Sequence, residues 1–169
     1  GLAVPRAEEF PRYTWPLMVA AARAAALGDD EALVEQVRAG MADLGSPHPA
    51  QRAGAAQTRA ILASGPDALP AWQEAVAAWR VDGQPYPLAG ALLGLALAAA
   101  AAGDRGLAGE AVEEACCITD DLHAAPLREE LDTLARRVGL RVSSRSAPDE
   151  PELLTVREQE VLRLVAEGL

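Results

Sequence analysis

The feature that most constrains this chain is a repeat of glycine-containing turns. Gly28, Gly65 and Gly103 stand in the stretches LGDD, SGPD and AGDR, and they follow one another at an almost constant interval of about 38 residues. A second series, Gly45 and Gly83, repeats the same interval. A fixed period of this length, with two glycine stops in each unit, is typical of stacked helical hairpins. The spacing therefore predicts an all-α fold built from antiparallel helix pairs.

Each predicted unit consists of a first helix, a tight turn and a second helix. The first helices are expected at residues 14–27, 47–64 and 86–102, and the second helices at residues 30–44, 67–82 and 105–122. A seventh helix is expected from Pro126 to Val138, with leucines on one side and charged residues on the other. A terminal unit needs a polar outer face, so this last helix is expected to cap a right-handed stack.

Local patterns predict the helix starts and the buried faces. Proline is tolerated where a helix begins, and the chain places prolines near the predicted starts: Pro16, Pro47, Pro49, Pro70, Pro85 and Pro87. The predicted N-caps are Thr14, Ser46 and Asp67. Helical periodicity predicts four apolar faces, formed by Leu33, Val37, Met41 and Leu44, by Leu69, Trp72, Val76 and Trp79, by Leu107, Ala111, Ala115, Ile118 and Leu122, and by Leu127, Leu131 and Leu134.

Much of the apolar content is alanine. Hydrophobic residues make up 50 % of the chain, but aromatic residues only 4 %. Alanine favours helix and occupies little volume, so the helices are expected to pack closely. The stretch LAGALLGLALAAAAAG, from Leu88 to Gly103, is interpreted as a buried helix rather than a membrane span, because it belongs to the repeat.

The charged residues exclude several functions. The chain contains no lysine and no asparagine, and all 15 of its cations are arginine, which we interpret as the codon bias of a GC-rich bacterial genome. A phosphate-binding G-x-x-x-x-G-K-[ST] loop, a protein-kinase lysine and a Schiff-base lysine are therefore excluded from this sequence. The formal net charge of −10 opposes binding of the chain as a whole to duplex DNA, because nucleic-acid affinity depends on neutralising phosphates.

No arrangement of side chains predicts catalysis. Cys116 and Cys117 are adjacent on a predicted helix, where successive side chains point about 100° apart, so we expect no bridge and a reducing cytoplasm. His48 and His123 have no neighbours at ligand spacing. The carboxylates are spaced as on solvated helix faces. We therefore expect no catalytic residue, no metal site, no cofactor in this chain and no enzyme activity.

Three aromatic residues are candidate anchors for a ligand or peptide. Trp72 and Trp79 are seven residues apart on one predicted helix face, and stacked helix pairs form concave grooves in which aromatic side chains bind partners. The alternative is that both tryptophans fill the core between alanines. Tyr86 lies between two prolines and is expected to fix the turn between two units.

The third unit resembles a tetratricopeptide repeat. Its turn at Gly103 places seven residues at or near the packing positions of that family: Leu92, Leu95, Ala96, Ala99, Ala108, Val112 and Ala115. The large aromatic residues and terminal proline of the family are missing, and the period is longer than its roughly 34 residues. The resemblance implies a superhelical, tetratricopeptide-like stack over residues 1–138 that acts as a sensor or interaction domain.

After Val138 the periodicity ends. Residues 139–152, GLRVSSRSAPDEPE, mix Gly, Ser, Pro and charges and are interpreted as a linker. Four arginines cluster around this boundary: Arg136, Arg137, Arg141 and Arg145. They either compensate the C-terminus of the seventh helix and solubilise the linker, or contact phosphates in a longer protein.

The chain closes with LLTVREQEVLRLVAEGL, residues 153–169. Thr155 and Glu158 form a capping box that opens a helix, and Gly168 supplies a stop. This stretch resembles the first helix of the LuxR-type helix-turn-helix domain, which it matches at Leu154, Thr155, Arg157, Glu158, Glu160, Val161, Leu162, Leu164, Val165, Ala166 and Gly168. Residues 153–169 are therefore expected to be the truncated N-terminal part of such a domain, in which Val161, Leu162 and Val165 would pack on further helices.

The resemblance implies a cytoplasmic bacterial transcription regulator of the large ATP-binding LuxR subgroup. Its helical domain would sense a small-molecule or protein effector in its groove, and DNA would be the partner of the intact protein. Arg141, Arg145 and Arg157 would contact phosphates there. The helix that reads bases lies two helices further on in that family, so this fragment is not expected to bind DNA specifically. ATP would bind to a module ahead of Gly1, not to this chain, and homo-oligomer formation is left open.

The alternative is a stand-alone protein-interaction module of tetratricopeptide-like design. In that case residues 153–169 would form a helix that docks on the stack as a cap, with Val161, Leu162 and Val165 facing the stack instead of further helices. Neither interpretation predicts a membrane partner.

Overall fold

The computed structural model describes residues 11–46 and 48–139. Within these ranges the chain is helical and contains no strand. The elements are α1 (Pro11–Gly28), α2 (Glu31–Ala42), α3 (Pro49–Leu62), the short 3₁₀ helix η1 (Gly65–Asp67), α4 (Ala68–Asp82), α5 (Pro85–Ala101), α6 (Arg105–Asp121) and α7 (Ala125–Val138). The predicted all-α fold is confirmed for this part of the chain, with helix boundaries within a few residues of those expected. The predictions for residues 140–169 lie outside the described residues.

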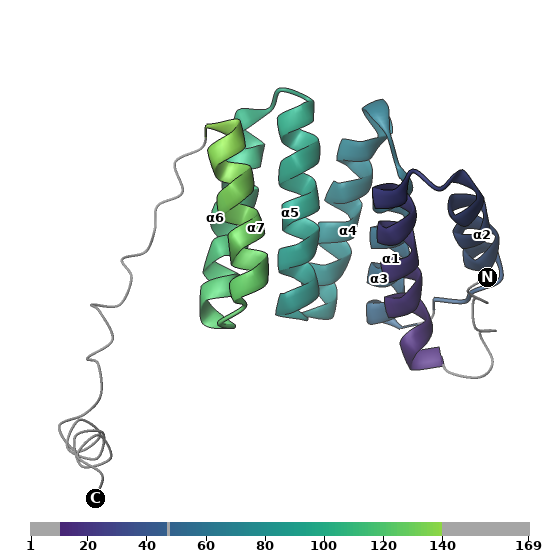
Figure 1. The fold of residues 1–169 in the computed structure, drawn as a ribbon. Helices are drawn as coiled ribbons and strands as arrows, with labels where there is room; N and C mark the ends of the chain where they lie inside the picture. Colours follow the sequence, from purple (N-terminus) through teal and green to yellow (C-terminus); the bar gives the residue numbers. More distant parts are fainter. Residues whose placement is uncertain (1–10, 47, 140–169) are drawn as a thin grey trace, which may run out of the picture.

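The helices stand side by side (Figure 1). Each expected pair is in contact, α1 with α2, α3 with α4 and α5 with α6. Neighbouring pairs are joined by contacts of α1 with α3 and of α4 with α5, and α7 packs on both α5 and α6. α4 is therefore the helix that connects the first half of the body to the second.

Three of the turns end their helices with the same backbone motif. A residue just past the helix has a positive φ, 50° at Asp29, 82° at Gly103 and 51° at His123. The N–H that follows donates to the carbonyl five residues back, over 3.1, 2.9 and 2.9 Å respectively, as in a Schellman motif. Gly28, predicted as the turn residue, is instead the last residue of α1. Asp29 takes the left-handed conformation, which aspartate tolerates better than most side chains.

The predicted N-caps are mostly wrong. Thr14 is buried inside α1, because the helix begins earlier than expected. Ser46 does not cap α3; the cap is His48, whose N–H donates to Gln51 Oε1 at 3.3 Å. Asp67 does precede α4, but its side chain makes no capping hydrogen bond, because η1 leads directly into that helix.

The side chains that cap helices are the aspartates after two of the turns. Asp30 accepts a hydrogen bond from the N–H of Leu33, and Asp104 accepts one from the N–H of Leu107, each over 3.0 Å. The same turn chemistry therefore starts α2 and α6. Pro16, expected near a helix start, lies within α1, where it cannot donate the usual helical hydrogen bond.

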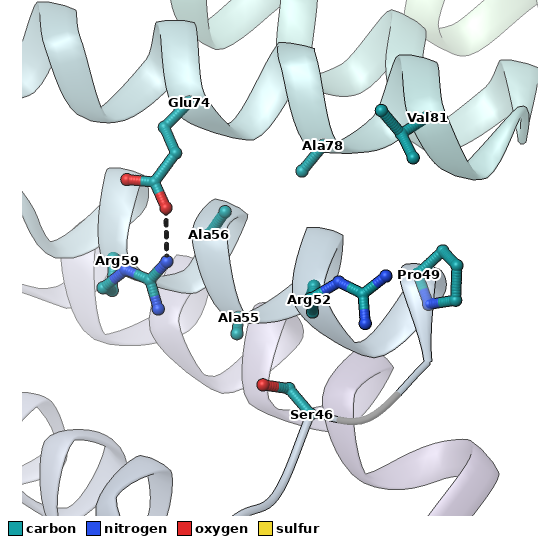
Figure 2. A pocket seen from close by; sticks show the side chains of 9 residues that line it. All are labelled: Ser46, Pro49, Arg52, Ala55, Ala56, Arg59, Glu74, Ala78 and Val81. Atoms are coloured by element: carbon teal, nitrogen blue, oxygen red, sulfur yellow. Dashed lines mark hydrogen bonds and ion pairs between the residues drawn. The ribbon is translucent and has the colours of Figure 1, made fainter.

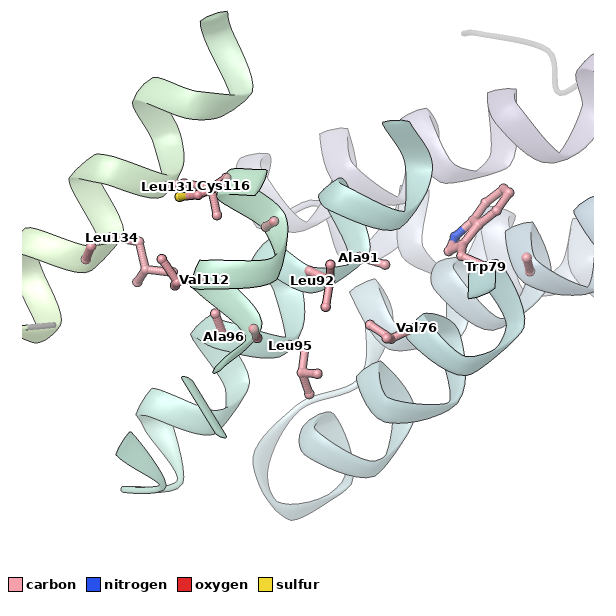
Figure 3. Close-up of a cluster of buried hydrophobic side chains, with 14 residues drawn as sticks. Val76, Trp79, Ala91, Leu92, Leu95, Ala96, Val112, Cys116, Leu131 and Leu134 are labelled. Atoms are coloured by element: carbon pink, nitrogen blue, oxygen red, sulfur yellow. The ribbon is translucent and has the colours of Figure 1, made fainter. Parts of the chain in front are cut away.

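The largest core cluster is formed mainly by α4, α5, α6 and α7 (Figure 3). Small side chains dominate it, and its larger members include Val76, Trp79, Leu92, Leu131 and Leu134. The seven residues of α5 and α6 at the expected packing positions, Leu92, Leu95, Ala96, Ala99, Ala108, Val112 and Ala115, are all buried. Leu122 is the exception on the face predicted for α6: it lies past the last helical turn and is 40 % exposed.

A second cluster joins α1, α2 and α3. Trp15, Met18, Ala22, Val37 and Ala55 are its buried members. The other three residues of the predicted apolar face of α2, Leu33, Met41 and Leu44, pack against it. That face is therefore confirmed.

Glycines allow two close contacts between neighbouring units. The ring of Trp72 on α4 lies directly over Gly94 on α5, so that a Cβ added at Gly94 would come within 2.4 Å of the ring. Trp15 on α1 lies over Gly54 on α3, where an added Cβ would come within 2.9 Å of the Trp15 Cβ. Each contact is tighter than any real Cβ contact allows, so only glycine fits at these two positions without a shift.

Charged residues anchor α7 to α6 and form its outer face. Arg128 pairs with Asp120 on α6, and its Nε donates to Asp132 Oδ1 at 3.1 Å. The hydrogen bond to Asp120 raises the pKa of the Arg128 guanidinium, which therefore stays charged. The opposite side of α7 exposes charged residues that include Glu129, Glu130, Arg136 and Arg137, the polar outer face expected of a terminal helix.

The alanine-rich α5 is surrounded by other helices of the body. It contacts α4, α6 and α7, and its buried residues include Ala91, Leu92 and Ala96. Among the described helices, none has both the length and the apolar character needed to cross a bilayer.

The contact between Trp72 and Gly94 gives a stability prediction. Gly94→Ala forces a Cβ into the Trp72 ring, and we expect it to lower the free energy of unfolding by about 2 kcal/mol, the usual cost of overpacking. Gly106→Ala is the matched control, because an added Cβ there meets only Asp104 Oδ1 at 3.5 Å. It is expected to stabilise by up to about 1 kcal/mol through helix propensity. Urea unfolding measures both, and equal effects of the two substitutions would contradict the packing described.

Candidate binding groove

A groove of about 370 Å³ lies among the first helices of the units. Side chains from α1, α3, α5 and α7 line it, together with Trp79 of α4. The lining residues are Trp15, Pro16, Val19, Arg23, Ala50, Gln51, Gly54, Gln57, Trp79, Gln84, Tyr86, Pro87, Gly90 and Leu127. Its size is that of a pocket for a small organic ligand.

Two tryptophans form fixed parts of the wall. Trp79 is 7 % exposed, and its indole Nε1 donates to Gln57 Oε1 over 2.8 Å. Trp15 is 4 % exposed, and its Nε1 donates to the carbonyl of Gly45 over 3.3 Å. Because each indole N–H has a partner within the protein, both rings are held in place, and only a small part of each borders the groove.

Tyr86 is the exposed aromatic residue of the groove. It lies in the first turn of α5, between Pro85 and Pro87, and is 60 % exposed. Each proline has its own φ fixed by its ring and sterically restricts the residue before it, so the two prolines limit the conformations that this turn can take. The sequence predicts that Tyr86 fixes the turn between units and packs against the next helix; its ring is instead 60 % exposed and borders the groove.

The polar residues that line the groove are glutamines and one arginine, Arg23. Gln57 is a lining residue but is buried, and its Oε1 accepts the hydrogen bond from Trp79. Gln84 Nε2 donates to Asp82 Oδ2 at 2.7 Å outside the groove. Arg23 reaches across from α1 to α5, and its Nη2 lies 3.2 Å from the place that a Cβ on Gly90 would occupy. No aspartate or glutamate lines the groove. The groove is therefore a locally positive, largely apolar site on a chain of net charge −10.

Trp72 does not belong to this site. It packs between the clusters of α3, α4 and α5, with its ring over Gly94. Of the three predicted anchors, Trp79 and Tyr86 line the groove, but Trp79 is also a buried member of the main core cluster, and Trp72 packs against that cluster. The alternative that the two tryptophans fill the core therefore describes both of them.

A second hollow, of about 340 Å³, lies between α3 and α4 (Figure 2). Arg59 on α3 pairs there with Glu74 on α4 over 2.7 Å, and both side chains are more than half exposed. Val81 at its edge is 78 % exposed. The ion pair already satisfies the charge of Arg59, and the apolar part of the lining is mostly alanine, so this hollow offers a ligand fewer anchoring groups than the groove does.

The two cysteines differ in environment. Cys116 is buried in the main core and Cys117 is exposed, and both are free thiols. Burial raises the pKa of the Cys116 thiol. Among the described residues, no three His, Cys, Asp or Glu side chains gather to hold a metal ion. His48 caps α3, and His123 occupies the turn before α7.

Sequence reasoning missed Trp15, Arg23 and Gln57. Trp15 lies in the first predicted helix, but nothing in its spacing shows that it faces α3 rather than α2. The sequence does contain a signal for a polar contact at Gln57, because this long polar side chain stands among alanines on a helix that buries one face. The predictions for Arg141, Arg145, Thr155, Arg157, Glu158, Glu160, Val161, Leu162, Val165 and Gly168 lie outside the described residues.

Comparisons with known proteins add no assignment. No protein-family model matches the chain, and no significant match is found among curated proteins or solved structures. The residues of the groove are therefore the guide to what it binds.

The cysteines give a second prediction. At pH 8 iodoacetamide is expected to modify Cys117 in the folded protein and to leave Cys116 unmodified, because alkylation needs an accessible thiolate. Burial holds the pKa of Cys116 above its usual range, so less thiolate forms there. Peptide mass spectrometry identifies the modified residue, and unfolding in urea should make both react. Equal labelling of the two residues in the native protein would show that Cys116 is not buried.

Proposed function

We propose that this chain is part of a bacterial LuxR-type transcription regulator, in which the helical body binds an effector in its groove and controls an attached DNA-binding unit. Two independent features support the proposal. The stretch 153–169 resembles the first helix of that DNA-binding domain. The groove is the observation that carries the sensing half of the proposal, because it combines fixed aromatic walls with an exposed tyrosine and a cation.

The tetratricopeptide-like interpretation of the body is part of this proposal. The contacts of α1 with α3 and of α4 with α5 join successive helix pairs, as stacking requires, although the two junctions use different helices of the units. The burial of the seven expected packing positions on α5 and α6 supports it further. Grooves lined by the first helices of successive units are where such stacks bind their partners.

The groove favours an effector with an anionic group and an apolar body. Arg23 supplies the positive charge, and no acidic side chain in the lining opposes it. Trp15, Trp79 and Tyr86 supply aromatic surface. A volume of about 370 Å³ suits a small organic molecule better than a folded partner.

The placement of α7 gives a route from effector to DNA-binding unit. Leu127 of α7 lines the groove, and the same helix ends at Val138, directly before Gly139, where the predicted linker begins. A molecule bound in the groove would contact α1, α3, α5 and α7 together and so bias the position of α7. The DNA-binding unit would respond through the linker, as in other switches in which a ligand prefers one arrangement of packed helices.

A fluorescent probe tests the groove. The anionic, apolar dye 8-anilinonaphthalene-1-sulfonate is expected to bind the folded chain with increased emission. Tyr86→Ala and Arg23→Gln should each weaken its apparent affinity by roughly threefold or more, as expected for loss of a single partly exposed contact. Tyr13→Ala is the matched control for Tyr86, because Tyr13 is similarly exposed, at 56 % against 60 %, but lies outside the groove. Arg105→Gln is the control for Arg23. Loss of binding in the controls alone would place the dye elsewhere.

The DNA-binding half is tested separately. In a gel-shift experiment, residues 1–169 alone are expected to show no specific duplex binding, because residues 153–169 resemble only the first helix of the domain and not the helix that reads bases, and because the net charge of −10 opposes phosphate contacts. Replacing residues 153–169 by a complete LuxR-type helix-turn-helix domain should give specific binding. A specific shift by the unmodified chain would contradict the assignment of residues 153–169 as an incomplete domain.

A further inference from the structure

A hollow lies at the end of the helical body where α7 ends, and we call it the exit hollow. Its volume is about 570 Å³. The last turns of α5 and α7 and the start of α6 meet there (Figure 1). Its lining includes Leu97, Ala101, Arg105, Leu134 and Arg137. Because α7 ends at Val138, the chain continues from the rim of this hollow.

Part of the apolar lining is open to solvent. Leu97 is 44 % exposed, whereas every other residue of α5 from Pro87 to Ala100 is buried or half-buried. Ala101 is exposed as well, and Leu134 of α7 is buried. A further apolar side chain placed over Leu97 would remove this surface from water, which is favourable.

The charged residues of the exit hollow are both cations. Arg105 and Arg137 are exposed, and no aspartate or glutamate lines the hollow. Neither arginine forms an ion pair with a carboxylate of residues 11–46 or 48–139. Four other arginines of this part of the chain do form such pairs: Arg38, Arg59, Arg80 and Arg128. The hollow therefore favours a segment that carries carboxylates next to apolar side chains.

One stretch of the chain beyond Gly139 has this composition. Residues 149–154 read DEPELL, so three carboxylates directly precede or flank a proline and are followed by Leu153 and Leu154. No cation occurs from residue 146 to residue 156. The later acidic residues of the chain are interspersed with Arg157 and Arg163 instead. Residues 149–154 therefore combine the charge and the apolar character that the exit hollow lacks.

We propose that the exit hollow is the docking site of residues 149–154 of the same chain. The carboxylates of this stretch pair with Arg105 and Arg137, and its two leucines cover Leu97. The proposal goes beyond the function proposed above and does not depend on it, because it uses neither the groove nor the identity of the domain to which residues 155–169 belong.

The length of the connecting chain supports this occupant. Asp149 follows Gly139 by ten residues, and a flexible chain of that length has a root-mean-square end-to-end distance of about 17 Å. Pro148 and Pro151 reduce the conformational freedom that the stretch would lose on docking. The groove suits the same stretch less well, because it carries one arginine and lies near Leu127, at the opposite end of α7.

The tether also favours this stretch over an acidic segment of any other molecule. A short flexible linker gives the attached segment an effective concentration in the millimolar range, roughly a thousandfold above a partner at micromolar concentration. Two copies of net charge −10 also repel each other. The same net charge opposes duplex DNA, whose phosphates are other anions that two arginines could bind.

Site-specific photo-crosslinking in the full chain identifies what covers the hollow. The photoreactive amino acid p-benzoylphenylalanine replaces Leu97, and peptide mass spectrometry locates the cross-link, which we expect at residues 149–154 of the same molecule. The same replacement at Leu122 is the matched control, because Leu122 is similarly exposed, at 40 % against 44 %, but lies before α7 and not at its end. Its yield of these cross-links should be lower by roughly threefold or more. A replacement at Ala101, exposed in the same hollow, repeats the experiment from a second position.

An exchange of charges tests the ion pairs. Arg105→Glu together with Arg137→Glu should lower the cross-linking yield by roughly threefold or more, because exposed opposite charges are replaced by like charges. Asp149→Arg together with Glu150→Arg should do the same, and all four substitutions combined should restore the yield. Arg136→Glu is the control and should leave the yield unchanged, because Arg136 is exposed beside Arg137 but does not line the hollow.

Three results would overturn the proposal. The first is an equal yield of cross-links to residues 149–154 from Leu97 and from Leu122. The second is a charge exchange that does not restore the yield. The third is a cross-link from Leu97 that joins two molecules, detected by mixing chains of natural and heavy isotopic composition, or that reaches added duplex DNA. A second copy or a phosphate would then be the occupant.

Discussion

The fold depends on how closely neighbouring helix pairs can approach one another at glycine and alanine. Trp72 over Gly94 sets the distance between α4 and α5, and Trp15 over Gly54 sets it between α1 and α3. Both contacts join one unit to the next, so two large side chains seated on two glycines fix the register of the stack. A core filled mainly by alanine buries little area per residue. Such a core needs close helix approach to gain enough dispersion contacts, and a few large rings to fill the remaining space.

The groove follows from the same constraint. α3 and α5 are linked chiefly through α4, which contacts both of them. The first helices therefore leave a space between them, and the ring of Trp79 closes its floor while hydrogen-bonded to Gln57. The two tryptophans of α4, seven residues apart, therefore have different structural roles. Trp72 spaces two units, whereas Trp79 forms a wall of the site.

The sequence predicted the helix pairs because the glycine period and the apolar periodicity agree with each other. It could not predict which tryptophan borders a groove, since Trp72 and Trp79 share one helix face, and their environments depend on the residues that α3 and α5 place opposite them, Gln57 for Trp79 and Gly94 for Trp72. The caps were misjudged for a related reason. Thr14 and Ser46 are good capping residues in isolation, but the chain begins α1 and α3 at prolines nearby and uses its aspartates after the turns instead. Asp29 and His123 show that the turn motif is imposed by the packing of the helices, because neither residue favours a positive φ as glycine does.

α1 contributes one wall of the groove. Trp15, Val19 and Arg23 line the groove from this helix, and Leu127 lines it from α7. α7 itself packs on α5 and α6. Under the proposed function, a molecule in the groove shifts α7 only if it binds one relative position of these helices more tightly than another, because a ligand moves an equilibrium by no more than its difference in affinity for the two arrangements.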